Sequence, residues 1–140
     1  MDILIENNII KCDSIISKNK AIGELCKVLH ESGYVKKEFE DSVMSKEEEF
    51  DTAIGFGLAI PHAMIDDKDD TIINTGLAIM ALPQGIIWNE KVVKFVVMIA
   101  ANGDEHIEIL SKIAVMCSSE EAVDRLCKLS ENEIYTKLTK

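Results

Sequence analysis

The sequence predicts an α/β fold in which one mixed β-sheet carries helices on both faces. Stretches with helical periodicity stand before, between and after apolar stretches that are rich in β-branched residues. Such elements pack together because each has one apolar side to bury. The 140 residues contain no internal repeat, low-complexity tract or linker-like stretch, so we expect one domain spanning residues 1–140.

The first part of the chain predicts two helices. Residues 3–10 fit either a short strand or an irregular segment. A helix is expected over residues 21–33, where Gly33 suits the left-handed end of a helix, and a second over residues 36–50. The residues expected to face inward are Ile22, Leu25, Cys26 and Leu29 in the first helix and Phe39, Val43 and Phe50 in the second.

The middle of the chain predicts the sheet. The stretch GFGLAI, residues 55–60, is expected to form a short strand that Pro61 ends. Residues 71–82 and 92–100 are apolar and β-branched, which predicts two longer core strands. Residues 83–91 between them carry turn residues and predict a hairpin or a short extra strand.

The C-terminal part predicts further helices. One is expected to begin at Asp104 and run to Cys117, and one or two more should occupy residues 120–140, with Ser130 as a candidate cap between them. In the first of these helices the inward residues are expected to be Ile107, Leu110, Ile113, Ala114 and Cys117.

Composition excludes several classes of function. The formal net charge of −10 opposes binding to nucleic acid. The longest apolar stretch, residues 95–101, is far shorter than the ~20 residues of a membrane helix, and no signal-like segment opens the chain, so we expect a cytoplasmic protein. The four cysteines, which lack metal-like spacing and are expected to be free thiols, are Cys12, Cys26, Cys117 and Cys127.

A histidine stands directly after the short predicted strand. Pro61 lacks a ladder N–H and drives Ile60 toward an extended backbone, so the strand ends at His62. Ligand crevices of open α/β sheets lie outside the carboxyl ends of strands. Imidazole has an ordinary pKa of about 6.5, so a neutral nitrogen able to attack phosphorus is abundant at neutral pH. The position suits a phosphoryl acceptor, and equally a polar residue that ends a strand with a backbone hydrogen bond.

Two more histidines occur in the chain. His106 opens a predicted helix, where backbone N–H groups and the helix dipole favour anions, so its imidazole could donate to phosphoryl oxygens if the helix packs beside His62. A histidine in a first helical turn is otherwise an ordinary solvated residue. His30 lies late in the first predicted helix and is expected to be structural or at the surface.

The block TAIGFGLAIPHA, residues 52–63, followed by GIIW and then DEHIEIL, resembles a known family. It is similar to the fructose/mannitol type of enzyme IIA domain of the bacterial phosphoenolpyruvate-dependent sugar phosphotransferase system. A threonine, a glycine pair, G-[ILV]-A-[ILV]-P-H and a downstream H-[IL]-x-x-L occur in order and at family-like spacing. The resemblance extends from Asn19 to the C-terminal helices and implies a phosphotransferase component with the fold described above.

The resemblance assigns roles to individual residues. His62 is the residue that accepts the phosphoryl group and gives it up again. His106 matches the family's second active-site histidine, which positions and neutralises that group. Thr52, Gly57 and Pro61 are expected to shape the pocket.

One position departs from the family. Lys46 stands where the family usually has an arginine before a glutamate, here Glu47. Lysine keeps the charge but lacks the planar fork that binds phosphate bidentately, so Lys46 is either a phosphate contact or a solvated side chain. Phe56, Ile60 and Met64 are expected to form an apolar collar for docking.

The resemblance also implies the partners. The phosphocarrier protein HPr would donate the phosphoryl group, and a cysteine of a IIB protein or domain would accept it for sugar uptake. No metal or organic cofactor is required, and neither nucleic acid nor membrane insertion is expected. The acidic charge suits partners with basic residues around their own active sites.

Three other interpretations stay open. A nitrogen-type enzyme IIA would keep the fold and regulate by phosphorylation-dependent protein binding. A metal-dependent hydrolase could use His62 and His106 with Asp66, Asp67 or Glu105, although no H-x-x-x-H spacing is present. In a non-catalytic binding module both histidines would be structural.

Overall fold

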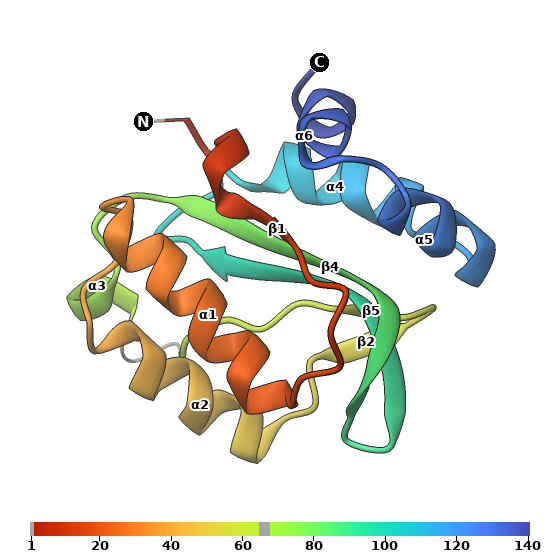
Figure 1. The fold of residues 1–140 in the computed structure, drawn as a ribbon. Helices are drawn as coiled ribbons and strands as arrows, with labels where there is room; N and C mark the ends of the chain where they lie inside the picture. Colours follow the sequence, from red (N-terminus) through yellow and green to blue (C-terminus); the bar gives the residue numbers. More distant parts are fainter. Residues whose placement is uncertain (1, 65–67) are drawn as a thin grey trace.

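A five-stranded sheet lies between two helical layers in the computed structural model, which describes residues 2–64 and 68–140 (Figure 1). The elements in chain order are η1 (Glu6–Asn8), β1 (Ile9–Lys11), α1 (Lys18–Glu31), α2 (Phe39–Glu49), β2 (Ala53–Gly55), β3 (Leu58–Ala59), α3 (Lys68–Thr71), β4 (Gly76–Trp88), β5 (Lys91–Ala100), α4 (Ile107–Met116), α5 (Glu120–Cys127) and α6 (Glu131–Thr139).

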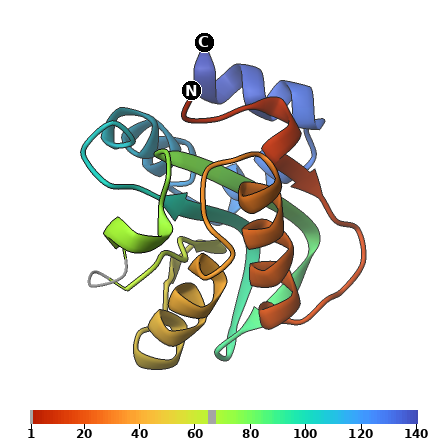
Figure 2. The same cartoon turned by 90° about the vertical axis from the view of Figure 1, so that its left-hand side faces the viewer.

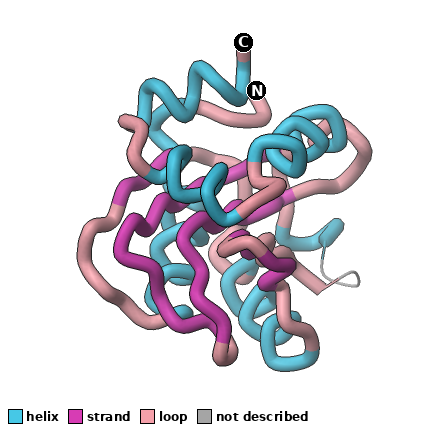
Figure 3. Tube along the Cα trace, turned by 90° about the vertical axis from the view of Figure 1, so that its right-hand side faces the viewer, coloured by secondary structure: helices cyan, strands magenta, loops and turns pink. Residues whose placement is uncertain are grey.

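The sheet is mixed, with strand order β1-β4-β5-β3-β2. The long β4–β5 pair is antiparallel and forms its centre, β1 joins β4 in parallel, and β3 joins β5 in parallel. β2 pairs antiparallel with β3 and is the outer strand on that side. The strands run side by side in one layer in Figure 3.

Alternation along β4 and β5 gives the sheet two apolar faces. Ala78, Met80 and Leu82 pack with the helices α1 and α2 on one face, and Leu77 and Ile79 pack with α4, α5 and α6 on the other. Figure 2 shows the two helical layers on opposite sides of the strands. The predicted α/β fold with helices on both faces is confirmed.

Serine side chains begin three of the helices. Ser17 accepts from the backbone N–H of Lys20 at the start of α1, and Ser119 begins α5 in the same way. Ser130 and Glu133 form a reciprocal capping box at the start of α6, which confirms Ser130 as the predicted cap. Gly33 follows α1 with a φ of +87°, in the left-handed conformation expected after a helix.

Several details of the sequence prediction are wrong. The predicted strand over residues 55–60 is broken by a turn at Phe56 and Gly57: Gly55 ends β2, and Leu58–Ala59 forms β3. The strand predicted over residues 71–82 begins only at Gly76, because Lys68–Thr71 forms the helix α3. The hairpin predicted within residues 83–91 is present: β4 runs through a bulge near Gly85 to Trp88, and the chain turns at Asn89 and Glu90.

Three side chains that were expected to face inward are exposed. Phe50 lies beyond the last residue of α2 and is 55% exposed. Ile107 begins α4 and is 52% exposed, and Ala114 also faces solvent, so α4 buries a narrower stripe than its apolar content suggested. An apolar residue at a helix end is not obliged to face the core.

Within the part of the chain that the structure describes, no helix combines the length and the apolar character needed to cross a membrane.

Candidate active site

Two parallel strands bring His62 to one edge of the sheet. β3 and β5 are aligned with Ala59 opposite Val96, and the chain continues past β3 so that His62 forms an isolated parallel bridge with Ile99. The backbone N–H of Ile99 donates to the carbonyl of Pro61 at 3.0 Å. Pro61 itself has no N–H, which ends regular pairing here. His62 therefore lies at the carboxyl edge of the sheet, as its sequence position predicted.

The ring of His62 is held by a backbone carbonyl. Its Nδ1 lies 2.8 Å from the carbonyl oxygen of Ile60. A carbonyl oxygen can only accept, so Nδ1 carries the proton and donates it. In the neutral ring this leaves the lone pair on Nε2. The half-buried side chain thus has one nitrogen tied to the backbone and the other available to attack an electrophile.

His106 reaches the same place from the helical side. It is the residue that immediately precedes α4, and its backbone carbonyl accepts from Leu110 in the first turn. The side chain is half-buried and its Nδ1 is buried without a hydrogen-bond partner among the described residues. An unpartnered buried ring nitrogen is unusual in a native protein and calls for a functional explanation.

The two histidines line one small cavity. It has a volume of about 190 Å³, and its walls are Ile60, His62, Ala63, Ile72, Ile99, Ala101 and His106. The two imidazoles are the ionisable groups in that wall, and the remaining lining is apolar. Apolar walls weaken competition from water, which strengthens any hydrogen bond from an imidazole to an anion.

The predicted pocket-shaping residues fall in different places. Pro61 lies in the backbone between the cavity residues Ile60 and His62. Thr52 is buried, and its carbonyl accepts from the N–H of Ile60 at 3.0 Å, so it acts on the cavity through the backbone. Gly57 lies just before β3, at the end away from His62, where its carbonyl accepts from the backbone N–H of Lys94.

A second cavity contains Gly57 instead. Its lining includes Phe56, Gly57, Val92 and Lys94. Gly57 has a φ of +87°, which a tight hairpin turn requires and a glycine adopts without strain. The structure thus places Gly57, and with it Phe56 of the expected collar, away from the histidine cavity. Ile60 lines that cavity, and Met64 is tied by its backbone N–H to Ser42 of α2.

Lys46 does not line the histidine cavity either. Its Nζ lies 4.2 Å from the centre of the Phe50 ring, a cation–π contact on the last turn of α2. Its neighbour Glu47 is buried, and the carboxylate accepts a hydrogen bond from the hydroxyl of Thr52. In the sequence prediction Glu47 was only the neighbour of Lys46 in the family pair at 46–47 and had no role of its own.

Other candidates from the sequence lie outside this site. His30 is exposed and its ring pairs with the carbonyl of Val35. The four cysteines are free thiols, and burial raises the pKa of Cys26 to about 12 and that of Cys117 to about 11, so neither is a ready nucleophile.

Among residues 2–64 and 68–140, no three side chains of His, Cys, Asp or Glu gather as metal ligands would. The hydrolase interpretation also named Asp66 and Asp67, which lie outside the described residues.

Fold and cavity together define an α/β protein with two imidazoles at the carboxyl edge of a mixed sheet. Residues 2–140 match the family described as "Phosphoenolpyruvate-dependent sugar phosphotransferase system, EIIA 2", and the chain belongs to this family. It is a phosphotransferase component of the fructose/mannitol type of enzyme IIA, as the motif around His62 indicated.

Curated relatives carry matching names. A "Mannitol-specific phosphotransferase enzyme IIA component" of Staphylococcus aureus is 38% identical over 127 residues, which cover 91% of this chain and 88% of that protein. The protein of the same name from Bacillus subtilis is 33% identical over 134 residues, covering 95% and 93%.

Solved structures share the fold. The crystal structure of IIA mannitol from Escherichia coli has a TM-score of 0.81 and 26% identity, covering 95% of this chain and 96% of that one. A complex of enzyme IIA mannitol with phosphorylated enzyme IIB mannitol, also from Escherichia coli, has the same TM-score and identity.

Proposed function

We propose that His62 carries a phosphoryl group between two visiting proteins. The observation that supports this most is the fixed ring of His62, whose Nδ1 proton is held by the Ile60 carbonyl while Nε2 is free in a cavity shared with His106. A ring anchored on one nitrogen presents the other in a constant direction, which an in-line displacement at phosphorus needs.

The transfer proceeds in two displacements. In the first, the Nε2 lone pair of His62 attacks phosphorus, a new P–N bond forms, and the bond from phosphorus to the donor breaks with its electron pair leaving on the donor. In the second, the acceptor attacks phosphorus and the electron pair of the P–N bond returns to Nε2. The Nδ1 proton stays in place throughout, because the Ile60 carbonyl keeps it.

His106 is proposed to stabilise the equatorial oxygens. A phosphoryl transition state spreads negative charge over these oxygens, so positioned donors lower its energy. His106 lines the same cavity as His62, and it immediately precedes α4, where the free N–H groups of a helix start favour anions.

The partners follow from the family. The chain passes its phosphoryl group to a IIB protein, and HPr is the donor. The curated relatives are mannitol-specific, so mannitol is the sugar that we propose for the full relay. The proposed site of action is the cytoplasm, with residues 1–140 working as one domain.

A regulatory, nitrogen-type role is less supported. A nitrogen regulatory protein from Neisseria meningitidis shares the fold with a TM-score of 0.75 at 23% identity. The sequence relatives at 33–38% identity are named as mannitol-specific phosphotransferase components instead.

The proposal is tested by reconstituting the relay. Purified protein is incubated with phosphoenolpyruvate, enzyme I and HPr, and acid-labile phosphate on the chain is measured. IIB and the membrane component are then added, and phosphorylation of mannitol is compared with that of fructose and galactitol. Phosphate on the chain without transfer to IIB would contradict the transport role, and preferred phosphorylation of another sugar would replace mannitol.

A further inference from the structure

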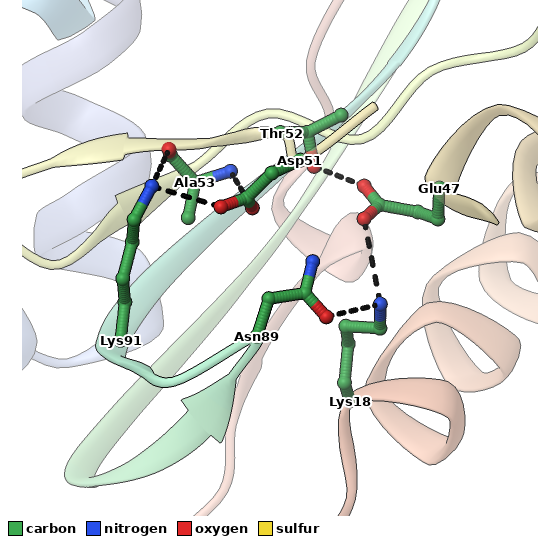
Figure 4. A network of polar contacts seen from close by, with 7 residues as sticks. All are labelled: Lys18, Glu47, Asp51, Thr52, Ala53, Asn89 and Lys91. Atoms are coloured by element: carbon green, nitrogen blue, oxygen red, sulfur yellow. Dashed lines mark hydrogen bonds and ion pairs between the residues drawn. The ribbon is translucent and has the colours of Figure 1, made fainter. Parts of the chain in front are cut away.

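A polar cluster with two buried members, Glu47 and Thr52, lies next to the segment that leads to His62. We name it the Glu47 cluster and define it as Lys18, Glu47, Thr52 and Asn89 (Figure 4). One carboxylate oxygen of Glu47 accepts from the Thr52 hydroxyl, and the other lies 3.7 Å from Nζ of Lys18. Lys18 also donates to the side-chain oxygen of Asn89 at 3.0 Å. Glu47 and Thr52 are only 6% and 4% exposed.

Stability alone is a weak reason for such a cluster. Burying a carboxylate carries a desolvation penalty that an ion pair at 3.7 Å offsets only in part, and Glu47 Oε2 has no hydrogen-bond partner among the described residues. Apolar residues of similar volume often stabilise a buried site as well as an ion pair does, or better. We therefore expect the contacts of the cluster to have a role in positioning other residues.

Hydrogen bonds connect Glu47 to the ring of His62 in three steps. The carboxylate of Glu47 holds the Thr52 side chain. The carbonyl of Thr52 accepts from the N–H of Ile60 at 3.0 Å. The carbonyl of Ile60, in turn, accepts from Nδ1 of His62 at 2.8 Å. Ile60 is thus the link: its N–H is bonded to Thr52, and its carbonyl is bonded to the His62 ring.

The edge position of β2 explains why a side chain is needed. β2 has three residues and pairs with β3 alone, so its outer side has no ladder partner. On the other side of Ile60, the Pro61 carbonyl is fixed by Ile99 of the central strand β5. The backbone around the Ile60 carbonyl is therefore held at the Pro61 carbonyl by β5 and at the Ile60 N–H by the carbonyl of Thr52, whose side chain is bonded to Glu47.

We propose that Glu47 is a positioning residue for phosphoryl transfer: through Thr52 and the Ile60 backbone it fixes the tautomer and direction of the His62 imidazole. This rests on the proposed function of His62 as the phosphoryl acceptor. Glu47 does not touch the phosphoryl group; it acts on the carbonyl that holds the Nδ1 proton. Loss of the cluster frees that carbonyl to rotate, and the proton is then no longer confined to Nδ1.

The test uses variants of both ends of the Glu47–Thr52 bond. Thr52→Val keeps the shape and removes the hydroxyl, and Glu47→Ala removes the acceptor. Thr52→Ser and Glu47→Gln retain a hydrogen bond and serve as conservative rescues. Lys91→Met is the matched control, because Lys91 anchors the same loop from the exposed side through Asp51 and the Ala53 carbonyl.

Three quantities are measured on each full-length variant. The ¹⁵N shifts of the His62 ring give the fraction of the Nδ1–H tautomer without any partner protein. The rate of transfer from phosphorylated HPr gives the function, and the thermal midpoint gives the stability. Thr52→Val and Glu47→Ala are expected to lower the Nδ1–H fraction and to slow transfer about tenfold. The double variant should be no slower than the slower single one, because the two residues act in one chain.

The conservative variants and Lys91→Met should keep the wild-type tautomer even where they lower the midpoint. If Thr52→Val loses stability but keeps the wild-type tautomer fraction and transfer rate, the proposal is wrong; if Glu47→Ala does not fold, Thr52→Val decides. A wild-type chain that takes up no phosphate contradicts the proposed function instead, and the tautomer measurement, which needs no phosphate, keeps the two failures apart.

Discussion

The two segments that carry the cavity histidines are built in opposite ways. His62 follows a short strand, and its ring is tied to the Ile60 carbonyl, on either side of which backbone bonds from Thr52 to the Ile60 N–H and from Ile99 to the Pro61 carbonyl hold the chain. His106 precedes a helix, and its Nδ1 has no hydrogen-bond partner among the described residues. One ring is fixed before any partner arrives, whereas the other has unused hydrogen-bonding capacity.

This difference suits the two side chains, which are chemically identical, to the different tasks that we propose for them. A nucleophile gains from a fixed direction, because misplacement by an ångström slows a displacement strongly. A group that stabilises developing charge needs capacity that the resting protein leaves unused. We therefore expect substitutions of the two histidines to differ in effect: loss of His62 should abolish phosphate uptake, and loss of His106 should only slow it.

The largest effect is expected for His62→Ala. This variant removes the attacking nitrogen, so incubation with phosphoenolpyruvate, enzyme I and HPr should add no acid-labile phosphate. Radiolabelled phosphate retained on the chain is the measurement. Labelling equal to that of the wild type would show that another residue is the acceptor.

A smaller effect is expected for His106→Ala. The acceptor remains, but a donor to the equatorial oxygens is lost, so transfer should slow about 100-fold while the final amount of phosphate stays the same. Rapid-quench kinetics measure both quantities. His30→Ala is the control, since His30 is exposed and lies outside the cavity. Equal rates for both variants would remove the role of His106.

A few-fold effect is expected for Lys46→Met. Lys46 lies over the Phe50 ring and does not line the cavity, so its charge acts on the approach of partners rather than on the chemistry. The transfer rate should fall roughly threefold at low ionic strength and match the wild type at high ionic strength. Lys128→Met, directly after α5, makes the same change of charge on the opposite face of the sheet and is the control. A loss that persists in high salt would place Lys46 in the site.

No effect on transfer is expected for Ser130→Ala. The Ser130 backbone N–H holds the Glu133 carboxylate and lowers its pKa, and the Ser130 side chain caps α6, far along the chain from both histidines. The substitution should lower the thermal midpoint by roughly 2–4 °C. A changed transfer rate would mean that α6 communicates with the cavity.

The Glu133 interaction also has a pH dependence of known sign. Because the pKa of Glu133 is lower in the folded chain, its stabilisation is present above the ordinary value of 4.5 and is lost as the pH falls through the folded pKa. Thermal midpoints of the wild type and Glu133→Gln should therefore converge in acid. Curves that remain parallel down to acidic pH would contradict this.

The sequence was sufficient to predict the fold class, the helix order and the strand-end position of His62. These depend on periodicity, on Pro61 and on turn residues, all of which are local signals. The turn at Phe56 and Gly57 was mistaken for strand, because Phe56 is apolar yet adopts a positive φ that only the hairpin geometry reveals. Apolar type alone likewise could not tell that Ile107 and Phe50 face outward.

The cavity wall was only partly predictable. Ile72 and Ile99 come from separate parts of the chain, and only the parallel alignment of β3 with β5 brings Ile99 beside His62. The carbonyl of Ile60 is a backbone group and leaves no mark in a sequence. The burial of Glu47 was hidden in a run of acidic residues that composition assigns to solvent.

The size of the histidine cavity limits what can react inside it. At about 190 Å³ it is smaller than the roughly 300–1,000 Å³ of pockets that enclose small organic ligands. A cavity of this size suits a phosphoryl group better than a drug-sized ligand. In the proposed relay the sugar does not enter it, so we expect a change of sugar preference to require a change of the downstream proteins, and inhibitors of this step to be better sought as mimics of a protein surface.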